Sequence, residues 1–408
     1  MRSNTLFSLL RRAIRIDFFL TLTLGLVLLA TAPAQAQTFT VLHAFTGVPD
    51  GKGPDSSLAL DATGNLYGTT GQGGARYHGS LFEVSPGGEE KIVYSFVAAH
   101  GTAPNWLIRD ADGALYGTTQ GGGAYNRGAV FKLDNKSRET VLYSFAGGAD
   151  GEWPNAVIHG ADGNSYGTTE YGGSTGCDEQ GCGTVFNLSP AGKKTTLYAF
   201  TGGTDGAIPV GGLVQDSAGN LYGVTGSGGN LSCNDGYGCG TVFAVDTAGS
   251  ETVLHTFIGG DDGIDPVGLV RDRQGNFYGT TNEGGLFGNG TVFKLDTSGQ
   301  EAVLYSFTGG SDGSLPTAGV VLDAAQNIYG TTEFGGAGSC DCGVVFVLDT
   351  SGKETVLHSF TWGADGALPV AGVSPDSAGN IYGTAILGGD LSCGFRGEGC
   401  GTVFKITP

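Results

Sequence analysis

The sequence predicts an all-β protein, a seven-bladed β-propeller with four-stranded blades. A Tyr-Gly-Thr-Thr motif returns seven times in 408 residues, twice with one change (YGVT and YGTA). Each copy lies in a unit with four short apolar runs, and the chain starts and stops at different points of that unit. The main alternative, a parallel β-helix, has rungs of about half this length or less. The seven copies begin at Tyr67, Tyr116, Tyr166, Tyr222, Tyr278, Tyr329 and Tyr382.

Residues 1–36 read as a secretory signal peptide, which leaves residues 37–408 as one propeller domain. Four arginines precede an apolar run over 18–30, and Ala34-Gln35-Ala36 fits a small-x-small cleavage site. A retained membrane anchor is the alternative, although the run is short for a membrane span. We therefore expect an exported protein, secreted, periplasmic or at the cell surface, with no membrane insertion after cleavage.

The chain is sparsely charged but acidic, with a formal net charge of −19. Loss of residues 1–36 removes four arginines and one aspartate, so the remaining chain is more acidic still. An acidic surface repels polyanions, which argues against nucleic acid or anionic membrane as a partner. The remaining partner classes are a carbohydrate or an extracellular protein, and we expect a monomer without a cofactor.

The fourth unit illustrates the predicted strands. Pro209 opens a first run that ends at Gln215, and a Ser-Ala-Gly-Asn turn leads to a second run over 221–225. A Gly-rich loop leads to a third run over 240–245, and a turn from Asp246 leads to a fourth over 252–257. Each run has strand length, is rich in β-branched and aromatic residues, and is bounded by Gly, Asp or Asn. No segment after residue 36 has a convincing helical period.

The two ends of the chain predict how the ring closes. A lone fourth-strand sequence stands at 41–45, and the chain stops after a third-strand sequence at 401–406. The N-terminal strand can therefore complete the last blade, which removes two exposed strand edges.

The combination VLYSF, TGGxDGxxP, DxxGNLYGTT, GG and GTVFKLD resembles the GloVer-type extracellular tandem repeat of choice-of-anchor proteins. The resemblance covers residues 39–408, and the DxxGNxY part is also similar, more weakly, to NHL-type propeller repeats. It implies export and a repeat architecture, and it transfers no catalytic residue or cofactor. The anchored members carry a sorting tail, whereas here Thr407 and Pro408 follow the last strand directly.

Loops between the second and third strands vary most, and variable loops on a rigid scaffold are common binding sites. They have 8 residues in units 1, 2 and 5, and 13, 14, 10 and 15 residues in units 3, 4, 6 and 7. The longer four hold every cysteine, two in each, which predicts local disulfides in an oxidising compartment. Zinc thiolate sites are the alternative, and a disulfide between Cys340 and Cys342 would close a strained ring, because one residue separates them. The pairs are Cys177 and Cys182, Cys233 and Cys239, Cys340 and Cys342, and Cys393 and Cys400.

An aspartate followed by glycine recurs in the connections between units, and unit 2 has His100 in its place. We interpret these residues chiefly as turn residues whose carboxylates cap backbone N–H groups. The alternative is a cation site at each connection or an acidic rim that attracts cationic ligands. The aspartates are Asp50, Asp150, Asp205, Asp262, Asp312 and Asp365.

Histidines offer weak catalytic candidates. His43, His255 and His358 stand where other units have tyrosine, which suggests a packing role, and His159 lies at a variable position near the end of a first strand. Only His78 and His100 lie in loops of the variable face, which carries the second-to-third loops and the connections between units. Neither has an identifiable nucleophile or acid–base partner nearby.

Aromatic residues that break the repeat are the binding candidates, because they could stack on sugar rings or peptide side chains. The alternative is that they fill gaps between blades. They are Trp106, Trp153, Trp362, Tyr77, Tyr125, Tyr171, Phe287, Phe334 and Phe395, with Asp150 and Asp365 as acidic neighbours.

These observations favour a secreted, non-catalytic binding or scaffold propeller, with its ligand over the face that carries the disulfide loops. An extracellular polysaccharide lyase or hydrolase that uses His78 or His100 is the first alternative. A structural repeat protein of the cell envelope is the second.

Overall fold

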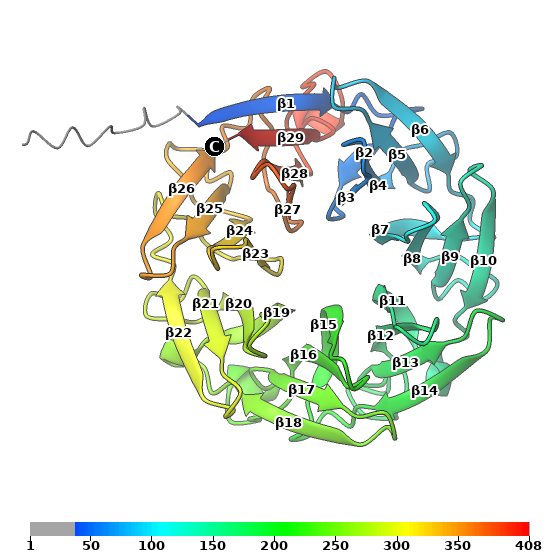
Figure 1. The fold of residues 1–408 in the computed structure, drawn as a ribbon, viewed down its shortest axis with the longest axis vertical. Coiled ribbons are helices and arrows are strands. Elements are labelled where there is room, and N and C mark those ends of the chain that lie inside the picture. Colours follow the sequence, from blue (N-terminus) through cyan, green and yellow to red (C-terminus); the bar gives the residue numbers. More distant parts are fainter. Residues whose placement is uncertain (1–36, 408) are drawn as a thin grey trace, which may run out of the picture. The chain divides into compact units, whose positions relative to one another are not determined.

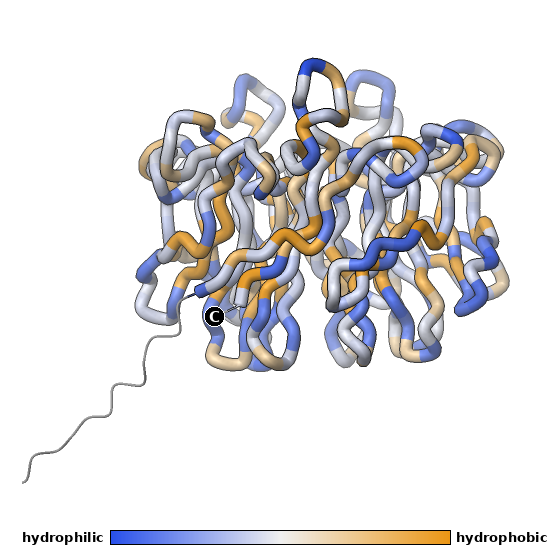
Figure 2. Tube along the Cα trace, turned by 90° about the horizontal axis from the view of Figure 1, so that it is seen from above, coloured by the Kyte–Doolittle hydropathy of each residue, from blue (hydrophilic) through white to orange (hydrophobic). Residues whose placement is uncertain are grey.

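The computed structural model describes residues 37–407, which form a ring of seven β-sheets (Figure 1). The predicted signal peptide lies outside the described residues. Hydrophobic residues concentrate in the middle of the disc, and hydrophilic residues concentrate in the loops of its two faces (Figure 2). The predicted seven-bladed propeller is confirmed.

The blades follow one another along the chain, each from an inner to an outer strand. Blade 1 contains β2 (Lys52–Pro54), β3 (Ala59–Leu60), β4 (Leu66–Gln72), β5 (Ser80–Val84) and β6 (Glu90–Ser95). Blade 2 contains β7 (Thr102–Arg109), β8 (Leu115–Gly121), β9 (Ala129–Leu133) and β10 (Glu139–Ser144). Blade 3 contains β11 (Glu152–His159), β12 (Ser165–Tyr171), β13 (Thr184–Leu188) and β14 (Lys194–Ala199). Blade 4 contains β15 (Ala207–Gln215), β16 (Leu221–Ser227), β17 (Thr241–Val245) and β18 (Glu251–Thr256).

Blade 5 contains β19 (Ile264–Arg271), β20 (Phe277–Glu283), β21 (Thr291–Leu295) and β22 (Glu301–Ser306). Blade 6 contains β23 (Val321–Leu322), β24 (Ile328–Thr332), β25 (Val344–Leu348) and β26 (Glu354–Ser359). Blade 7 contains β27 (Ser374–Pro375), β28 (Ile381–Ala385) and β29 (Thr402–Thr407), and β1 (Thr38–Ala44) supplies its outer strand. Four single-turn 3₁₀ segments, Gly148–Asp150, Asn234–Gly236, Gly260–Asp262 and Phe395–Gly397, are the helical segments in the described part of the chain.

Ring closure follows the prediction, because β1 pairs antiparallel with β29 from Thr38 opposite Thr407 to Ala44 opposite Thr402. The N-terminal strand thus covers the edge that the last strand would otherwise expose.

Strand boundaries differ from the prediction at the inner edge of the ring. After the first-strand proline, the inner strands of blades 1, 6 and 7 pair over only two residues, which is shorter than predicted. In blade 4 the inner strand is longer than predicted, because β15 begins before Pro209. The residue before the first-strand proline has a positive φ, for example +53° at Leu315, and proline has no N–H to donate. In blades 2 to 5 the ladder continues past the proline with a shift of register, so the proline alone does not account for the short ladders of blades 1, 6 and 7.

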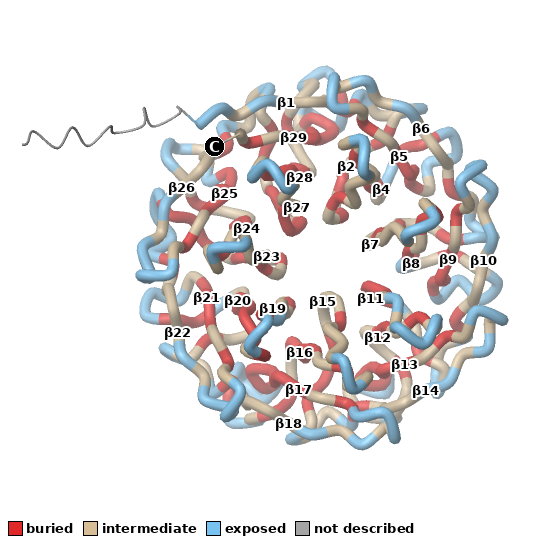
Figure 3. Tube along the Cα trace, viewed as in Figure 1, coloured by how far each residue is buried: buried red, intermediate tan, exposed pale blue. Residues whose placement is uncertain are grey.

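The core lies between blades, because each hydrophobic cluster combines residues of two neighbouring blades. Exposed residues lie mainly in the loops and at the outer edge of the ring (Figure 3). The third strand of every blade carries a fully buried Phe, and its ring meets the Phe after the outer strand of the preceding blade, at centroid distances of 5.0–5.4 Å. Phe45 against Phe82 is one such pair, at 5.0 Å. Edge-on aromatic pairs of this kind hold the blades together.

The Tyr-Gly-Thr-Thr strand serves this packing. In blade 1 the Tyr67 hydroxyl donates to Asp61 of the hairpin before it, at 3.3 Å. A Cβ on Gly68 would lie 2.4 Å from Cζ of Phe82, so only glycine fits there. Thr69 donates to the Pro104 carbonyl of blade 2 at 3.2 Å, and so ties two blades together. The motif is structural.

Candidate functional site

One face of the ring carries all of the long loops. In an antiparallel blade, the loops between the second and third strands and the connections between blades emerge on the same face. We call this side the loop face. The hairpins that join the other strands emerge on the opposite face.

Four disulfides close the four longest loops of the loop face, as the sequence predicts. Their Cα atoms are 5.3–5.6 Å apart, which suits a disulfide, and the described residues include no free cysteine. The second cysteine of each pair precedes the third strand and is fully buried. Each long loop is therefore anchored in the core. The pairs are Cys177–Cys182, Cys233–Cys239, Cys340–Cys342 and Cys393–Cys400.

Exposed aromatic side chains recur around the loop face. They come from the second-to-third loops of five blades, and each is more than half exposed. Aromatic rings bury a large apolar area when they are covered, so a row of exposed rings on one face suits ligand binding. They are Tyr77, Tyr125, Tyr237, Phe287 and Phe395, with exposed fractions of 72%, 61%, 67%, 53% and 68%.

A groove of about 430 Å³ lies on this face between the disulfide loops of blades 3 and 4. Its apolar walls are Tyr171, Ile208, Leu231 and Tyr237, and Asp178 and Gln180 supply polar groups. Tyr237 was not among the candidates from sequence. The sequence feature that could have indicated Tyr237 is its position between the two cysteines of the long loop in blade 4.

The three tryptophans have different surroundings. Trp153 is 44% exposed and meets Tyr171 edge-on at 5.5 Å, so this pair extends the aromatic surface beside the groove. Trp362 packs against the core cluster between blades 6 and 7 that contains Cys342, as do the partly buried Cys340 and Leu387. The side chain of Trp106 in blade 2 reaches past blade 3 to blade 4, because a Cβ on Gly212 of blade 4 would lie 3.5 Å from its Cζ2.

The central channel contains polar groups that the sequence analysis missed. The residue after each first-strand proline faces this cavity of about 560 Å³ in all blades, and these residues include Asp55, Asn105 and Asn155. Burial raises the pKa of Asp55 to about 7, and its Oδ1 has no hydrogen-bond partner among the described residues. The two asparagines reach the carbonyls of Pro154 and Pro209 in the next blades, at 3.4 and 2.6 Å. The sequence feature that could have indicated these residues is that the residue after the first-strand proline differs from unit to unit.

The recurring aspartates hold the connections between blades, as the turn interpretation predicts. Each accepts a hydrogen bond from the backbone N–H four residues before it, at 2.7–3.0 Å. Each also bonds the Tyr or His seven residues before it, for example Tyr305 to Asp312 at 2.9 Å and His43 to Asp50 at 3.3 Å. The histidines are therefore more than packing residues. They alternate with tyrosine because both have a polar atom at the tip of an aromatic ring.

A third residue completes this arrangement at each blade interface. The outer strands follow one another around the perimeter, so the start of one lies near the end of the previous one (Figure 1). The third residue begins the next outer strand, and we call the set a rim triad. The rim triads are His43–Asp50–Glu90, Tyr94–His100–Glu139, Tyr143–Asp150–Lys194, Tyr198–Asp205–Glu251, His255–Asp262–Glu301, Tyr305–Asp312–Glu354 and His358–Asp365–Phe39.

Several rim glutamates have a strongly raised pKa. Burial, and then the adjacent aspartate charge, raise the pKa of Glu251 and of Glu354 to about 7. In blade 3, Lys194 replaces the glutamate, and its ammonium lies 3.1 Å from Asp150 with its side chain only 3% exposed. Each rim triad therefore places charged groups in partly buried surroundings.

The two histidine candidates for catalysis have different surroundings. His100 is bound into a rim triad, 2.7 Å from Glu139 and 3.3 Å from the Tyr94 hydroxyl. His78 is half-buried, and its backbone carbonyl accepts a hydrogen bond from Ala103 of the next blade. His159 lies away from both, bonded to Ser165 and edge-on to Tyr116.

Fold and loops together define a tandem-repeat β-propeller with one loop-bearing face. The model of the Gloeobacter/Verrucomicrobia repeat matches residues 25–178, 77–263 and 231–408. The chain belongs to this repeat family. A search of curated proteins finds no match, and no helix in residues 37–407 is long and apolar enough to span a membrane.

Solved structures share the fold at low identity. A streptogramin B lyase superposes with a TM-score of 0.60 at 13% identity, over 91% of this chain and 97% of that chain. A catalytically inactive virginiamycin B lyase from Staphylococcus aureus gives 0.58 at 14% identity, over 91% and 99%. An extracellular domain from B. thetaiotaomicron gives 0.56 at 13% identity, over 91% and 41%. At these identities the likeness concerns the fold alone.

Proposed function

We propose that this protein is an extracellular binding propeller that holds a neutral carbohydrate in the groove between the disulfide loops of blades 3 and 4. The observation that carries the proposal is the pair of tyrosines, Tyr171 and Tyr237, that line this groove beside Asp178 and Gln180. Tyrosine faces stack on sugar rings, and the carboxylate and amide can bind sugar hydroxyls.

Two further features support binding on this face. The disulfides hold both loops before a ligand arrives, which reduces the entropy lost on binding. The four local disulfides also suit an oxidising, extracellular compartment. A net charge of −19 disfavours anionic polysaccharides, so neutral or cationic chains remain.

Glycan-array screening of the purified protein, followed by titration calorimetry on any hit, tests the proposal. Tyr237→Ala should weaken binding by about tenfold or more, because it removes one wall of the groove. Tyr125→Ala is the matched control, since Tyr125 is similarly exposed but lies on blade 2, and it should leave the affinity unchanged. Equal losses in both variants, or binding of protein ligands alone, would overturn the carbohydrate assignment.

A catalytic function has one specific observation in its favour, which is Asp55 in the channel. A carboxyl group whose pKa is about 7 can exchange protons near neutral pH. Turnover of any polysaccharide that is lost in Asp55→Asn, with the fold intact, would replace the binding proposal with an enzyme.

A further inference from the structure

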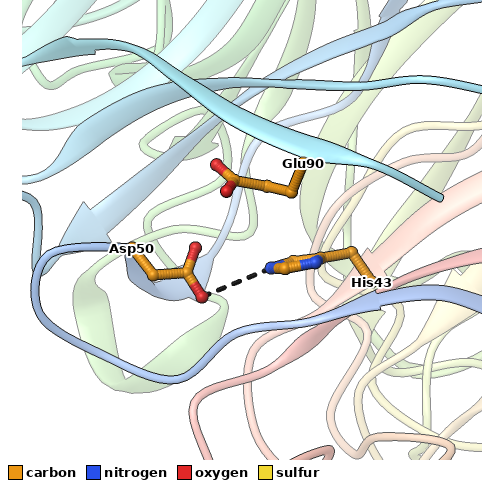
Figure 4. Close-up of side chains that lie close together, drawn as sticks. All are labelled: His43, Asp50 and Glu90. Atoms are coloured by element: carbon orange, nitrogen blue, oxygen red, sulfur yellow. Dashed lines mark hydrogen bonds and ion pairs between the residues drawn. The ribbon is translucent and has the colours of Figure 1, made fainter.

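Two of the seven rim triads combine an imidazole with two carboxylates. In the first, His43 comes from β1, Asp50 from the connection to blade 1 and Glu90 from the start of β6 (Figure 4). The second has the same order, His255, Asp262 and Glu301. In each, one ligand atom from every residue lies within 4.8 Å of the other two.

Some carboxylate oxygens of these triads have no hydrogen-bond donor among the described residues, although Asp50 Oδ2 and Asp262 are hydrogen-bonded. Asp50 Oδ1 and Glu90 Oε1 are buried and accept no hydrogen bond, and Glu301 Oε1 is in the same state. Adjacent buried carboxylate oxygens without donors are costly, so the site is suited to a positive species between them.

Distances within the triads suit a small divalent ion. The His43 and Asp50 ligand atoms are 3.3 Å apart, and those of His255 and Asp262 are 3.2 Å apart. Zinc bonds of about 2.0–2.2 Å in a tetrahedron place two ligands about 3.3–3.6 Å apart. The side chains of His43 and Asp50 remain 19% and 12% exposed, so an ion can enter from solvent and keep a water as its fourth ligand.

The other interfaces lack this combination of one imidazole with two carboxylates, although Glu139, Glu251 and Glu354 also have an Oε1 without a hydrogen-bond partner in residues 37–407. At the interface between blades 2 and 3 the Lys194 ammonium lies beside Asp150, so a cation is built into the chain. Phe39 replaces the glutamate at the last interface and stacks on His358, with ring centroids 3.6 Å apart. Two triads with tyrosine, Tyr198–Asp205–Glu251 and Tyr305–Asp312–Glu354, place a phenol where a metal would need the imidazole nitrogen.

We propose that His43–Asp50–Glu90 and His255–Asp262–Glu301 each bind one divalent transition-metal ion of the zinc type, and thereby join blade 7 to blade 1 and blade 4 to blade 5. One nitrogen and two carboxylate oxygens form a three-ligand site with an open position.

Zinc binding to the purified protein without a histidine tag tests the proposal, by equilibrium dialysis and metal analysis after chelator treatment. The unchanged protein should bind two zinc ions and show a higher Tm with zinc than with chelator. His43→Tyr and His255→Tyr should each remove one ion, and the double variant both. Tyrosine occupies this position in four other blades, so these variants should fold.

A gain-of-site variant separates metal binding from mere stability. Tyr198→His places an imidazole beside Asp205 and Glu251, and should raise the stoichiometry from two to three. With cobalt(II) in place of zinc, the intensity of visible absorption should follow the same number of bound ions in each variant. Failure of folded protein to bind zinc, a stoichiometry that the three substitutions do not move, or binding of calcium but not zinc would each overturn the proposal.

Discussion

Single residues of the rim show how a small repeat unit joins neighbouring blades. Asp312 accepts hydrogen bonds from the Thr308 backbone at 2.8 Å, the Thr308 hydroxyl and the Tyr305 hydroxyl at 2.9 Å. Asp312 is only 9% exposed, so there is little room for water to act as the acceptor for these donors if the carboxylate is lost. One side chain therefore fixes both the turn and the outer strand that precedes it.

Replacement of Asp312 by alanine should destabilise the protein by about 1–3 kcal/mol, because partly buried donors lose their acceptor. Chemical denaturation measured by tryptophan fluorescence gives the change in unfolding free energy. Asp261→Ala is the control, because Asp261 is an exposed aspartate in an equivalent connection and its replacement removes the same charge. A loss below about 0.5 kcal/mol for Asp312→Ala would show that the turn holds without its carboxylate.

At the interfaces between blades, ionisable side chains are partly buried. At the rim, Glu354 lies beside Asp312, and burial with this neighbouring charge raises the Glu354 pKa from 4.5 to about 7. The folded protein therefore binds a proton that the unfolded chain releases between about pH 4.5 and 7. Stability from this group is present below pH 4.5 and is lost as the pH rises through 7.

Glu354→Gln keeps the shape of the protonated side chain but cannot ionise. The variant should thus raise Tm at pH 8 and change it little at pH 5. Thermal unfolding followed by circular dichroism at both values measures the difference. Glu179→Gln is the matched control, because Glu179 is exposed. A Tm gain of the same size at pH 5 would show that charge at Glu354 is not the cause.

The sequence was sufficient to predict the blades and insufficient to predict the triads, for a physical reason. The Tyr-Gly-Thr-Thr strand and the apolar runs mark periodic local structure, so strand number and ring closure follow from spacing. Asp50 and Glu90 are forty positions apart and meet only because consecutive outer strands lie end to end around the ring. Comparison of the seven outer-strand starts would have shown the recurring glutamate, but not what it faces.

Channel residues were missed for a related reason. Trp106 was predicted as a possible ligand contact or plug, and only the closed ring shows it reaching toward Gly212 of blade 4. Asp55 follows an ordinary strand-opening proline, and its burial arises from the approach of seven inner strands rather than from its neighbours in sequence.

At the scale of the whole molecule, β1 closes the ring, because it precedes blade 1 in the sequence but pairs in the sheet of blade 7. Phe45, directly after β1, is fully buried and meets Phe82 of blade 1, while β1 itself pairs along the length of β29. This short segment therefore joins the last blade to the first. A ring that depends on one such strand should unfold as a unit when the strand is missing.

Deletion of residues 1–45 should consequently destabilise the whole ring. The loss of unfolding free energy should exceed the value expected for one buried phenylalanine, which is about 3–5 kcal/mol. It also exposes the edge of β29, so aggregation should increase. Deletion of residues 1–36 is the control and should preserve Tm, because it leaves β1 intact. A synthetic peptide of residues 37–46 should restore Tm to the shorter chain by filling the vacant edge. An unchanged Tm after the longer deletion, in monomeric protein by gel filtration, would mean that the propeller holds together as an open ring.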